Sequence, residues 1–229
     1  MNHQESGKET AVNEPGTIRV TGKGLIHLKP DTVRVTMTLE GMDPDYAETL
    51  KRSAADTGKV REAIAPLGFL REDLRTLNFH VQAEYEGYQE EGVYRQRLTG
   101  YRFRHELKLE FPLDDERLGQ VLAALANAAL TPEIGIAYTV KDREAAKNAL
   151  LGLAVADAMQ KASALTEAAN VKLGRIRHID YSIGENAFAV QPVLYAGKAR
   201  KMCADSFSPG IVPEDIEAED TVAVIWEIE

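Results

Sequence analysis

Apolar and polar residues alternate over much of the chain, a pattern typical of strands with one buried face. The clearest case is residues 32–41, where Val33, Val35 and Met37 alternate with polar side chains. The same pattern predicts strands over residues 17–28, 73–86, 100–112, 133–141, 174–183 and 221–229. The last of these is apolar on both faces, so we expect it in the centre of a sheet. The first two strands are predicted to pair as a hairpin.

Two glycines, Gly22 and Gly24, interrupt the first strand. Glycine inside a strand indicates a bulge or the close approach of another backbone. The Gly22-Lys23-Gly24 sequence also resembles part of a phosphate-binding loop, but the full consensus is absent and no helix follows at once. We therefore favour the structural interpretation.

The longest helical pattern covers residues 142–174 and is not chemically reactive. Asp142 is a suitable N-cap, and Asn170 stands where a left-handed residue would end the helix. Asp157 and Lys161, one turn apart, should form an ion pair. The predicted buried stripe consists of small and apolar residues at Leu151, Ala154, Val155, Ala158, Ala162, Leu165 and Ala169.

Two shorter amphipathic helices are predicted. The first begins at an Asp43 N-cap with Pro44 in its first turn and stops near residues 66–68. Its predicted buried face is Ala47, Leu50, Ala54, Thr57 and Ile64. The second begins at an Asp114 N-cap, with Leu118, Val121, Leu122, Leu125 and Ala129 facing inward.

The order of elements between residues 32 and 141 is strand, helix, strand, strand, helix, strand. This is the order of the ferredoxin-like βαββαβ unit. We therefore predict an α+β protein with a ferredoxin-like unit over residues 31–141. A second subdomain, over residues 17–30 and 142–229, would add the N-terminal strand, the long helix and the C-terminal strands. Residues 1–16 are polar without periodicity, and we expect a disordered lead-in there.

The formal net charge of −9 and the pI of about 5.2 argue against nucleic acid or an anionic membrane as a general partner. No segment approaches the roughly 20 continuous apolar residues that span a bilayer. The N-terminus lacks the basic-then-apolar order of a secretory signal, so we expect a soluble, cytoplasmic protein. The single cysteine, Cys203, excludes an internal disulfide.

No motif of established chemistry is present. The histidines, among them His105 on the apolar side of its strand, lie in separate elements without metal-ligand spacing. Cys203 lies near basic residues, which leaves a redox role open beside that of a bystander thiol. We expect no catalytic residues, no cofactor and no metal.

Two segments are candidates for association. Tyr85, Tyr88 and Tyr94 suit an interface, although simple packing within a hairpin explains them equally well. Residues 185–213 form a long irregular arm, and such arms are usually functional or contact a partner. The arm carries Phe188, Leu194, Tyr195 and Phe207, which we expect to pack against another subunit.

The chain resembles the SIMPL-domain family, which includes a bacterial periplasmic immunogenic antigen. The resemblance runs from Thr17 to the C-terminus and is carried by Ile18, Val20, Gly22, Gly24, Pro30-Asp31, Gly68, Asp73 to Thr76, Gly100 to Arg102, Asp157-Ala158, Lys161-Ala162 and Leu173-Gly174. It implies a compact α+β protomer that assembles into large symmetric ring- or channel-like oligomers, without established catalytic activity.

Members of this family are loosely tied to stress tolerance, and an animal relative is an adaptor in kinase signalling. Many bacterial members carry an export signal, so export is the alternative to a cytoplasmic location. Where the family pattern leads us to expect glycine and asparagine, this chain has Asn170 and His105. The resemblance implies a non-enzymatic, self-assembling protein. The alternative is a small-molecule or peptide-binding module with a pocket under the 185–213 arm.

Overall fold

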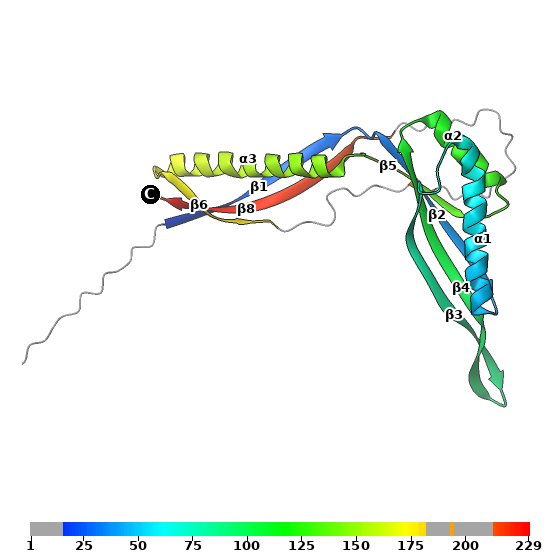
Figure 1. The fold of residues 1–229 in the computed structure, drawn as a ribbon. Helices are drawn as coiled ribbons and strands as arrows, with labels where there is room; N and C mark the ends of the chain where they lie inside the picture. Colours follow the sequence, from blue (N-terminus) through cyan, green and yellow to red (C-terminus); the bar gives the residue numbers. More distant parts are fainter. Residues whose placement is uncertain (1–15, 182–192, 195–212) are drawn as a thin grey trace, which may run out of the picture. The chain divides into compact units, whose positions relative to one another are not determined.

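The computed structural model describes residues 16–181, 193–194 and 213–229, which form two compact units. Within these ranges, the terminal unit combines residues 16–27, 142–181 and 217–229, and the central unit combines residues 28–141, 193–194 and 213–216. Each unit has its own sheet, helix layer and hydrophobic core (Figure 1). The α+β class predicted from the sequence is confirmed.

The central unit is built on a five-stranded sheet in the order β3-β4-β2-β5-β7. Its strands are β2 (Thr32–Asp43), β3 (Leu74–Glu90), β4 (Val93–Pro112), β5 (Glu133–Thr139) and β7 (Val193–Leu194). All neighbouring pairs are antiparallel. The order of the four longer strands is compatible with the predicted ferredoxin-like unit.

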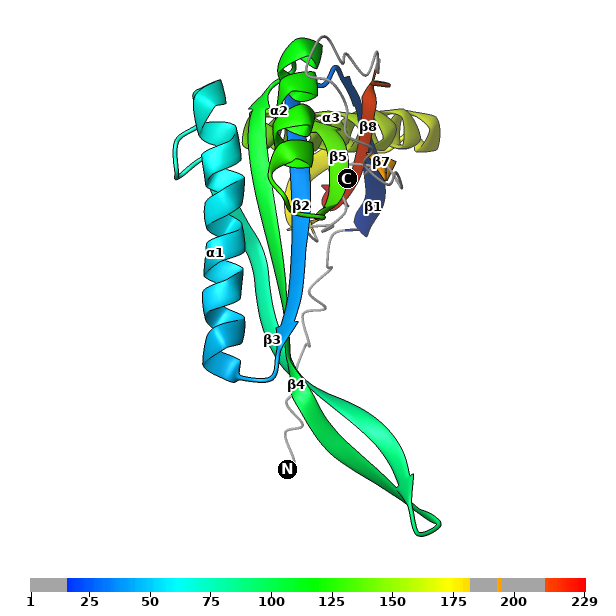
Figure 2. The ribbon, with the colours of Figure 1, turned by 90° about the vertical axis from the view of Figure 1, so that its right-hand side faces the viewer.

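Two helices, α1 (Tyr46–Ile64) and α2 (Asp115–Asn127), cover one face of this sheet (Figure 2). A short 3-10 turn, η1 (Ala65–Leu67), follows α1. The core between helices and sheet contains the predicted inward residues of β2 and β4, including Val33, Val35, Met37, Leu39, Phe103, Leu107, Leu109 and Phe111. Alternation along these strands therefore located the buried face correctly.

The start and the buried face of α1 differ from the prediction. Asp45, not Asp43, is the N-cap, because its Oδ1 accepts hydrogen bonds from the N–H groups of Ala47 and Glu48. The helix turns a partly polar face inward, so that the predicted Ala47 and Ala54 are exposed. Thr57 and Ile64 are buried as predicted, and the face also buries Thr49, Ser53, Asp56 and Val60, which were not predicted.

For α2 the prediction holds except at its end. Asp114 caps the helix by accepting a 3.0 Å hydrogen bond from Arg117 N–H. Ala129 was predicted to face inward, but the helix ends at Asn127 and Ala129 is exposed with a φ of 52°.

The terminal unit has a three-stranded sheet, β1-β8-β6, beneath helix α3 (Arg143–Ala169) (Figure 1). The strands are β1 (Gly16–Leu28), β6 (Leu173–Asp180) and β8 (Ile216–Ile228). The predicted central position of the last strand is confirmed. The predicted hairpin of the first two strands is wrong, because β1 pairs with β8 and both edges of β2 are occupied by β4 and β5.

Helix α3 begins and ends as predicted, but its buried stripe is shifted. Asp142 Oδ1 accepts from Ala145 N–H at 2.8 Å, and Asn170 is left-handed with a φ of 54°. Leu165 and Ala169 are exposed, contrary to the prediction. The residues buried against the sheet follow a strict four-residue spacing: Ala146, Leu150, Ala154, Ala158, Ala162 and Thr166.

Two glycines of β1 let this stripe of α3 lie directly against the strand backbone. A Cβ at Gly22 would collide with the Ala154 carbonyl oxygen and lie 2.7 Å from Ala158 Cβ. A Cβ at Gly24 would collide with the Leu150 carbonyl oxygen. Of the two alternatives from the sequence, close backbone approach is therefore the one observed.

Candidate functional site

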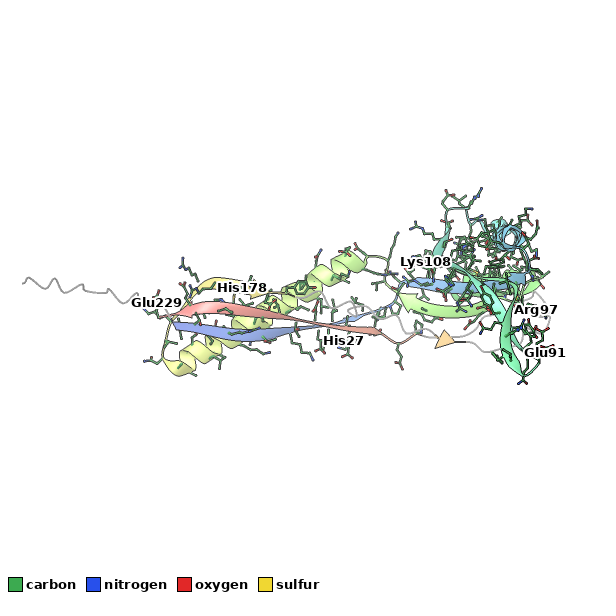
Figure 3. All side chains as sticks on the ribbon, turned by 90° about the horizontal axis from the view of Figure 1, so that it is seen from below. His27, Glu91, Arg97, Lys108, His178 and Glu229 are labelled. Carbon is green, nitrogen blue, oxygen red and sulfur yellow. The ribbon has the colours of Figure 1, made fainter. Side chains whose placement is uncertain are left out.

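The hairpin of β3 and β4 extends past the N-terminal end of α1 (Figure 2). Its tight turn is made by Glu91 and Gly92, which both have positive φ, 52° and 79°, as hairpin turns of this kind require. Glu91 lies at the tip, and Arg97 lies on the returning strand (Figure 3). In the part of the chain that the structure describes, the hairpin beyond residue 84 pairs only with itself.

One face of the hairpin tip carries no charge. The strand register places Tyr85, Gly87, Gln89, Tyr94, Gln96 and Leu98 on this face. The Tyr94 ring lies across Gly87, where its hydroxyl occupies the space that a Cβ would fill. Tyr85 is 59% exposed, Tyr94 72% and Leu98 44%.

The opposite face of the tip is charged and internally paired. Glu86 pairs with Arg97 at 3.0 Å, and Glu90 pairs with Arg95 at 3.1 Å. Tyr88 lies on this face, with the Arg97 guanidinium 6.0 Å from its ring centroid. The structure therefore separates the three predicted interface tyrosines, with Tyr85 and Tyr94 on the uncharged face and Tyr88 on the other.

The uncharged face continues along β3 on the helix side of the sheet. Leu77, at a bulge, is 50% exposed and Phe79 is 43% exposed. They stay exposed because α1 packs over β2 and β4 while β3 lies at the edge of the sheet. We call Leu77, Phe79, Tyr85, Tyr94 and Leu98 the apolar strip.

Most of the other predicted interface residues lie outside the described residues. This applies to Phe188, Tyr195 and Phe207, and also to Cys203. Leu194 is described, and it pairs with Gly135 at the edge of the central sheet. The predicted role of the 185–213 arm, with a pocket beneath it, stays a prediction.

A cluster of hydroxyl groups surrounds His105 between α1 and the sheet. The Nδ1 atom lies 3.2 Å from both Ser53 Oγ and Thr57 Oγ1, and Nε2 lies 2.9 Å from Thr76 Oγ1. The Phe79 ring packs edge-on against the imidazole at 5.0 Å. The sequence placed His105 on the apolar side but missed its partners. The four-residue spacing of Thr49, Ser53 and Thr57 was the available signal for a polar stripe on α1.

The hydrogen bonds identify the tautomer of His105. Thr57 Oγ1 donates its proton to the Ser53 carbonyl oxygen at 2.8 Å, so it can only accept from His105. Nδ1 therefore carries the hydrogen, and Nε2 accepts from Thr76. Desolvation by burial, followed by the nearby charge of Arg61, lowers the pKa of His105 below 6.5. The folded protein thus favours the neutral imidazole.

The sheet face opposite the helices carries a network of ion pairs. Burial alone would raise the pKa of Glu110, but hydrogen bonds from Arg34 at 2.7 Å and Lys108 at 3.1 Å outweigh it and lower the pKa to about 2. Lys108 lies on β4, well away from the hairpin tip (Figure 3). Arg104 also joins Glu40 and Glu106. Of these pairs, Arg34–Glu110 and Arg104–Glu40 join β2 to β4, whereas the other two lie within β4.

A cleft of about 310 Å³ lies between α1 and the segment that joins α2 to β5. Leu39 and Ala55 contribute to its apolar lining. Its cations are already engaged, since Lys59 pairs with Asp56 at 2.7 Å and Arg52 donates to the Met42 carbonyl at 2.9 Å. The cleft therefore has no evident preference for a charged ligand.

Among the residues with described positions, no group of three or more His, Cys, Asp or Glu side chains could hold a metal ion. None of the described helices is both long enough and apolar enough to cross a membrane.

Fold and surface together define an α+β protein with two sheet-and-helix units and an exposed, partly aromatic hairpin. The chain belongs to the SIMPL family, described as a protein of unknown function (DUF541), which matches residues 18–226. This agrees with the resemblance inferred from the sequence. A comparison with curated proteins gives no match.

Proposed function

We propose that this protein is a non-enzymatic, self-associating protein, and that its copies associate through the apolar strip. The observation that carries the proposal is the uncharged, aromatic face of the β3–β4 hairpin, with Tyr85 and Tyr94 more than half exposed. The strip is a surface that two copies of an acidic chain can bring together without burying charge.

The energetics of the hairpin support this role. A two-stranded hairpin is at best marginally stable in water unless a third strand or layer covers it. The tip, beyond residue 84, has only its two strands in the described structure. Packing against a partner would supply the missing layer and remove Tyr85, Tyr94 and Leu98 from water, at roughly 25 cal/mol for each Å² of apolar surface buried. Tyrosine is enriched at such interfaces.

The surroundings of His105 support the non-enzymatic part of the proposal. Ser53 lies within reach of the imidazole, as a nucleophile does in a hydrolase. However, Ser53 is only 3% exposed, and Thr57 lies at the same distance from the same ring nitrogen. The hydroxyls therefore hydrogen-bond the half-buried imidazole instead of presenting a nucleophile to a substrate.

Light scattering coupled to size-exclusion chromatography tests the proposal. The full chain should elute with a mass that is a multiple of 25.2 kDa. The double variant Tyr85→Ser/Tyr94→Ser should shift toward the single-chain mass, because it removes the aromatic contacts. Tyr88→Ser is the matched control on the charged face and should keep the wild-type mass.

Two outcomes would overturn the proposal. One is a wild-type protein that stays a single chain at high concentration, which would direct attention to a ligand-binding role instead. The other is an equal loss of mass in Tyr88→Ser and in the double variant, because the effect would then not depend on the uncharged face.

A further inference from the structure

Strand β3 is a long strand at the edge of its sheet. It spans Leu74–Glu90, and in the described structure its only neighbour is β4. An edge of this length presents a row of backbone N–H and C=O groups that another strand can pair with. Proteins usually blunt such an edge with bulges, prolines or charged side chains. In β3 the bulge at Leu77 does this at one end, but residues 78–83 pair regularly with β4 and contain no Pro, Lys, Arg, Asp or Glu. This stretch of the edge is therefore open to a partner strand.

The side chains of β3 on the face opposite the helices are arranged symmetrically about His80. The register with β4 puts Arg75, Asn78, His80, Gln82 and Glu84 on this face, because Leu77 is the extra residue of a bulge. The neighbours of His80 on this face are two amides, Asn78 on one side and Gln82 on the other. The next residues outward are a cation, Arg75, and an anion, Glu84.

We propose that two copies pair their β3 edges antiparallel, centred on His80, so that the two central sheets become one continuous sheet. This proposal rests on the self-association proposed above and adds to it a second contact, along the strand edge. In this register Asn78 lies opposite Gln82 of the second copy, and Arg75 lies opposite its Glu84. On the helix side, Phe79 lies beside Val81 of the second copy, which joins the two apolar strips.

Charge selects the antiparallel arrangement. A parallel pairing in register would place Arg75 beside Arg75 and Glu84 beside Glu84, and like charges directly opposite are destabilising. The carboxylate of Glu84 can take a second cation. Arg102 Nε at 2.8 Å and Gln82 Nε2 at 3.0 Å both donate to its Oε1, which leaves Oε2 for Arg75 of the second copy.

The apolar residues fix the register. Because side chains alternate between the two faces of a strand, a slip by one residue would place the exposed Phe79 opposite residues of the charged face. The bulge at Leu77 matters for the same reason, since without it Arg75 would lie on the helix side.

Charge reversal tests the pairing in the full chain, by the concentration dependence of the mass in light scattering. Arg75→Glu and Glu84→Arg should each raise the dissociation constant about tenfold, because each reversal acts at both ends of the symmetric interface. The double variant Arg75→Glu/Glu84→Arg should recover most of the affinity. Glu90→Arg is the matched control: it also breaks a cross-strand ion pair, with Arg95, but lies outside the proposed contact.

Cross-linking provides a second readout. In a Cys203→Ser background, His80→Cys should form a disulfide between copies under mild oxidation, because facing residues of antiparallel strands lie at disulfide distance. Glu90→Cys, near the far end of the strand, should not form a disulfide between copies, because the two positions 90 lie far apart in this register.

The outcomes separate this inference from the self-association itself. If the wild type is oligomeric but His80→Cys does not cross-link and the double reversal does not restore affinity, the strand pairing is overturned while self-association stands. If the wild type is a single chain, both proposals are overturned.

Discussion

His105 illustrates how one residue links the hydrogen bonding of a core to the pH dependence of stability. Its imidazole is held by three hydroxyl groups from α1 and β3. In the neutral tautomer the single Nδ1–H faces the oxygens of Ser53 and Thr57, and Nε2 accepts from Thr76. Protonation would place a half-buried positive charge near Arg61. The folded state therefore resists protonation more strongly than the unfolded chain.

We predict that stability falls as the pH drops below about 6.5 because of His105. Its folded-state pKa is lowered by desolvation and by Arg61, so below the unfolded pKa the unfolded chain binds more protons. The stabilisation is present above pH 6.5 and is lost as the pH falls toward the folded-state pKa. Urea unfolding at pH 7.5 and pH 5.5 would show the stability gap between wild type and His105→Gln shrinking at the lower pH.

The control for this measurement is His178→Gln, because His178 is exposed and lies outside the cluster. That variant should keep the wild-type difference between the two pH values. A gap between wild type and His105→Gln that is the same at both pH values would contradict the assignment.

The sequence could predict the side of the strand on which His105 lies but not its partners. Alternation in β4 fixes the side of His105. Thr57 was correctly placed on the buried face of α1, but Thr49 and Ser53 were missed because the rest of that face was chosen from apolar residues. Polar residues enter a core only when another element supplies their hydrogen-bond partners. That supply depends on tertiary structure, which a single segment does not contain.

At the scale of elements, the packing of α3 on β1 determines the terminal unit. Glycine in the strand and alanine in the helix let the two backbones approach closely. A hydrogen bond of 2.7 Å from Lys23 N–H to Asp157 Oδ2 also joins the strand to the helix. Asp157 forms the predicted ion pair with Lys161, also at 2.7 Å.

We predict that Gly22→Ala destabilises the terminal unit by at least about 1–3 kcal/mol, the usual cost of overpacking a core. The added methyl would meet backbone atoms of Ala154 and Ala158, which cannot move without displacing the helix. Gly152→Ala is the control, because a Cβ there meets nothing within 4 Å. Since alanine favours a helix by up to about 1 kcal/mol over glycine, chemical denaturation should show Gly152→Ala as neutral or stabilising. Equal effects of the two substitutions would contradict the packing argument.

Pairing between elements was harder to predict than the elements themselves. The strand patterns, the caps at Asp114 and Asp142 and the left-handed Asn170 were all visible in the sequence. The hairpin of β1 and β2 was inferred from the short turn between them, because neighbouring strands usually pair. The partners that displace this pairing, β8 and β5, lie far along the chain. Long-range competition of this kind leaves no local signal.

At the scale of the whole molecule, the described residues form two hydrophobic cores that share no residue. One contains Phe103, Leu107 and Val121. The other contains Val20, Ala158 and Trp226. Trp226 is the chain's single tryptophan and is 2% exposed. Its fluorescence therefore reports on the terminal unit, whereas far-UV circular dichroism reports on both units.

We predict that substitutions in the two cores act on these probes differently. Leu107→Ala should cost about 2–5 kcal/mol by opening a cavity in the central core, because Leu107 is 1% exposed. It should lower the midpoint of the circular dichroism transition in urea more than that of Trp226 fluorescence. Gly22→Ala should lower the fluorescence midpoint instead. If each variant moved both midpoints by the same amount, the two cores would unfold as one cooperative unit, and the separation of the chain into two units would have no thermodynamic counterpart.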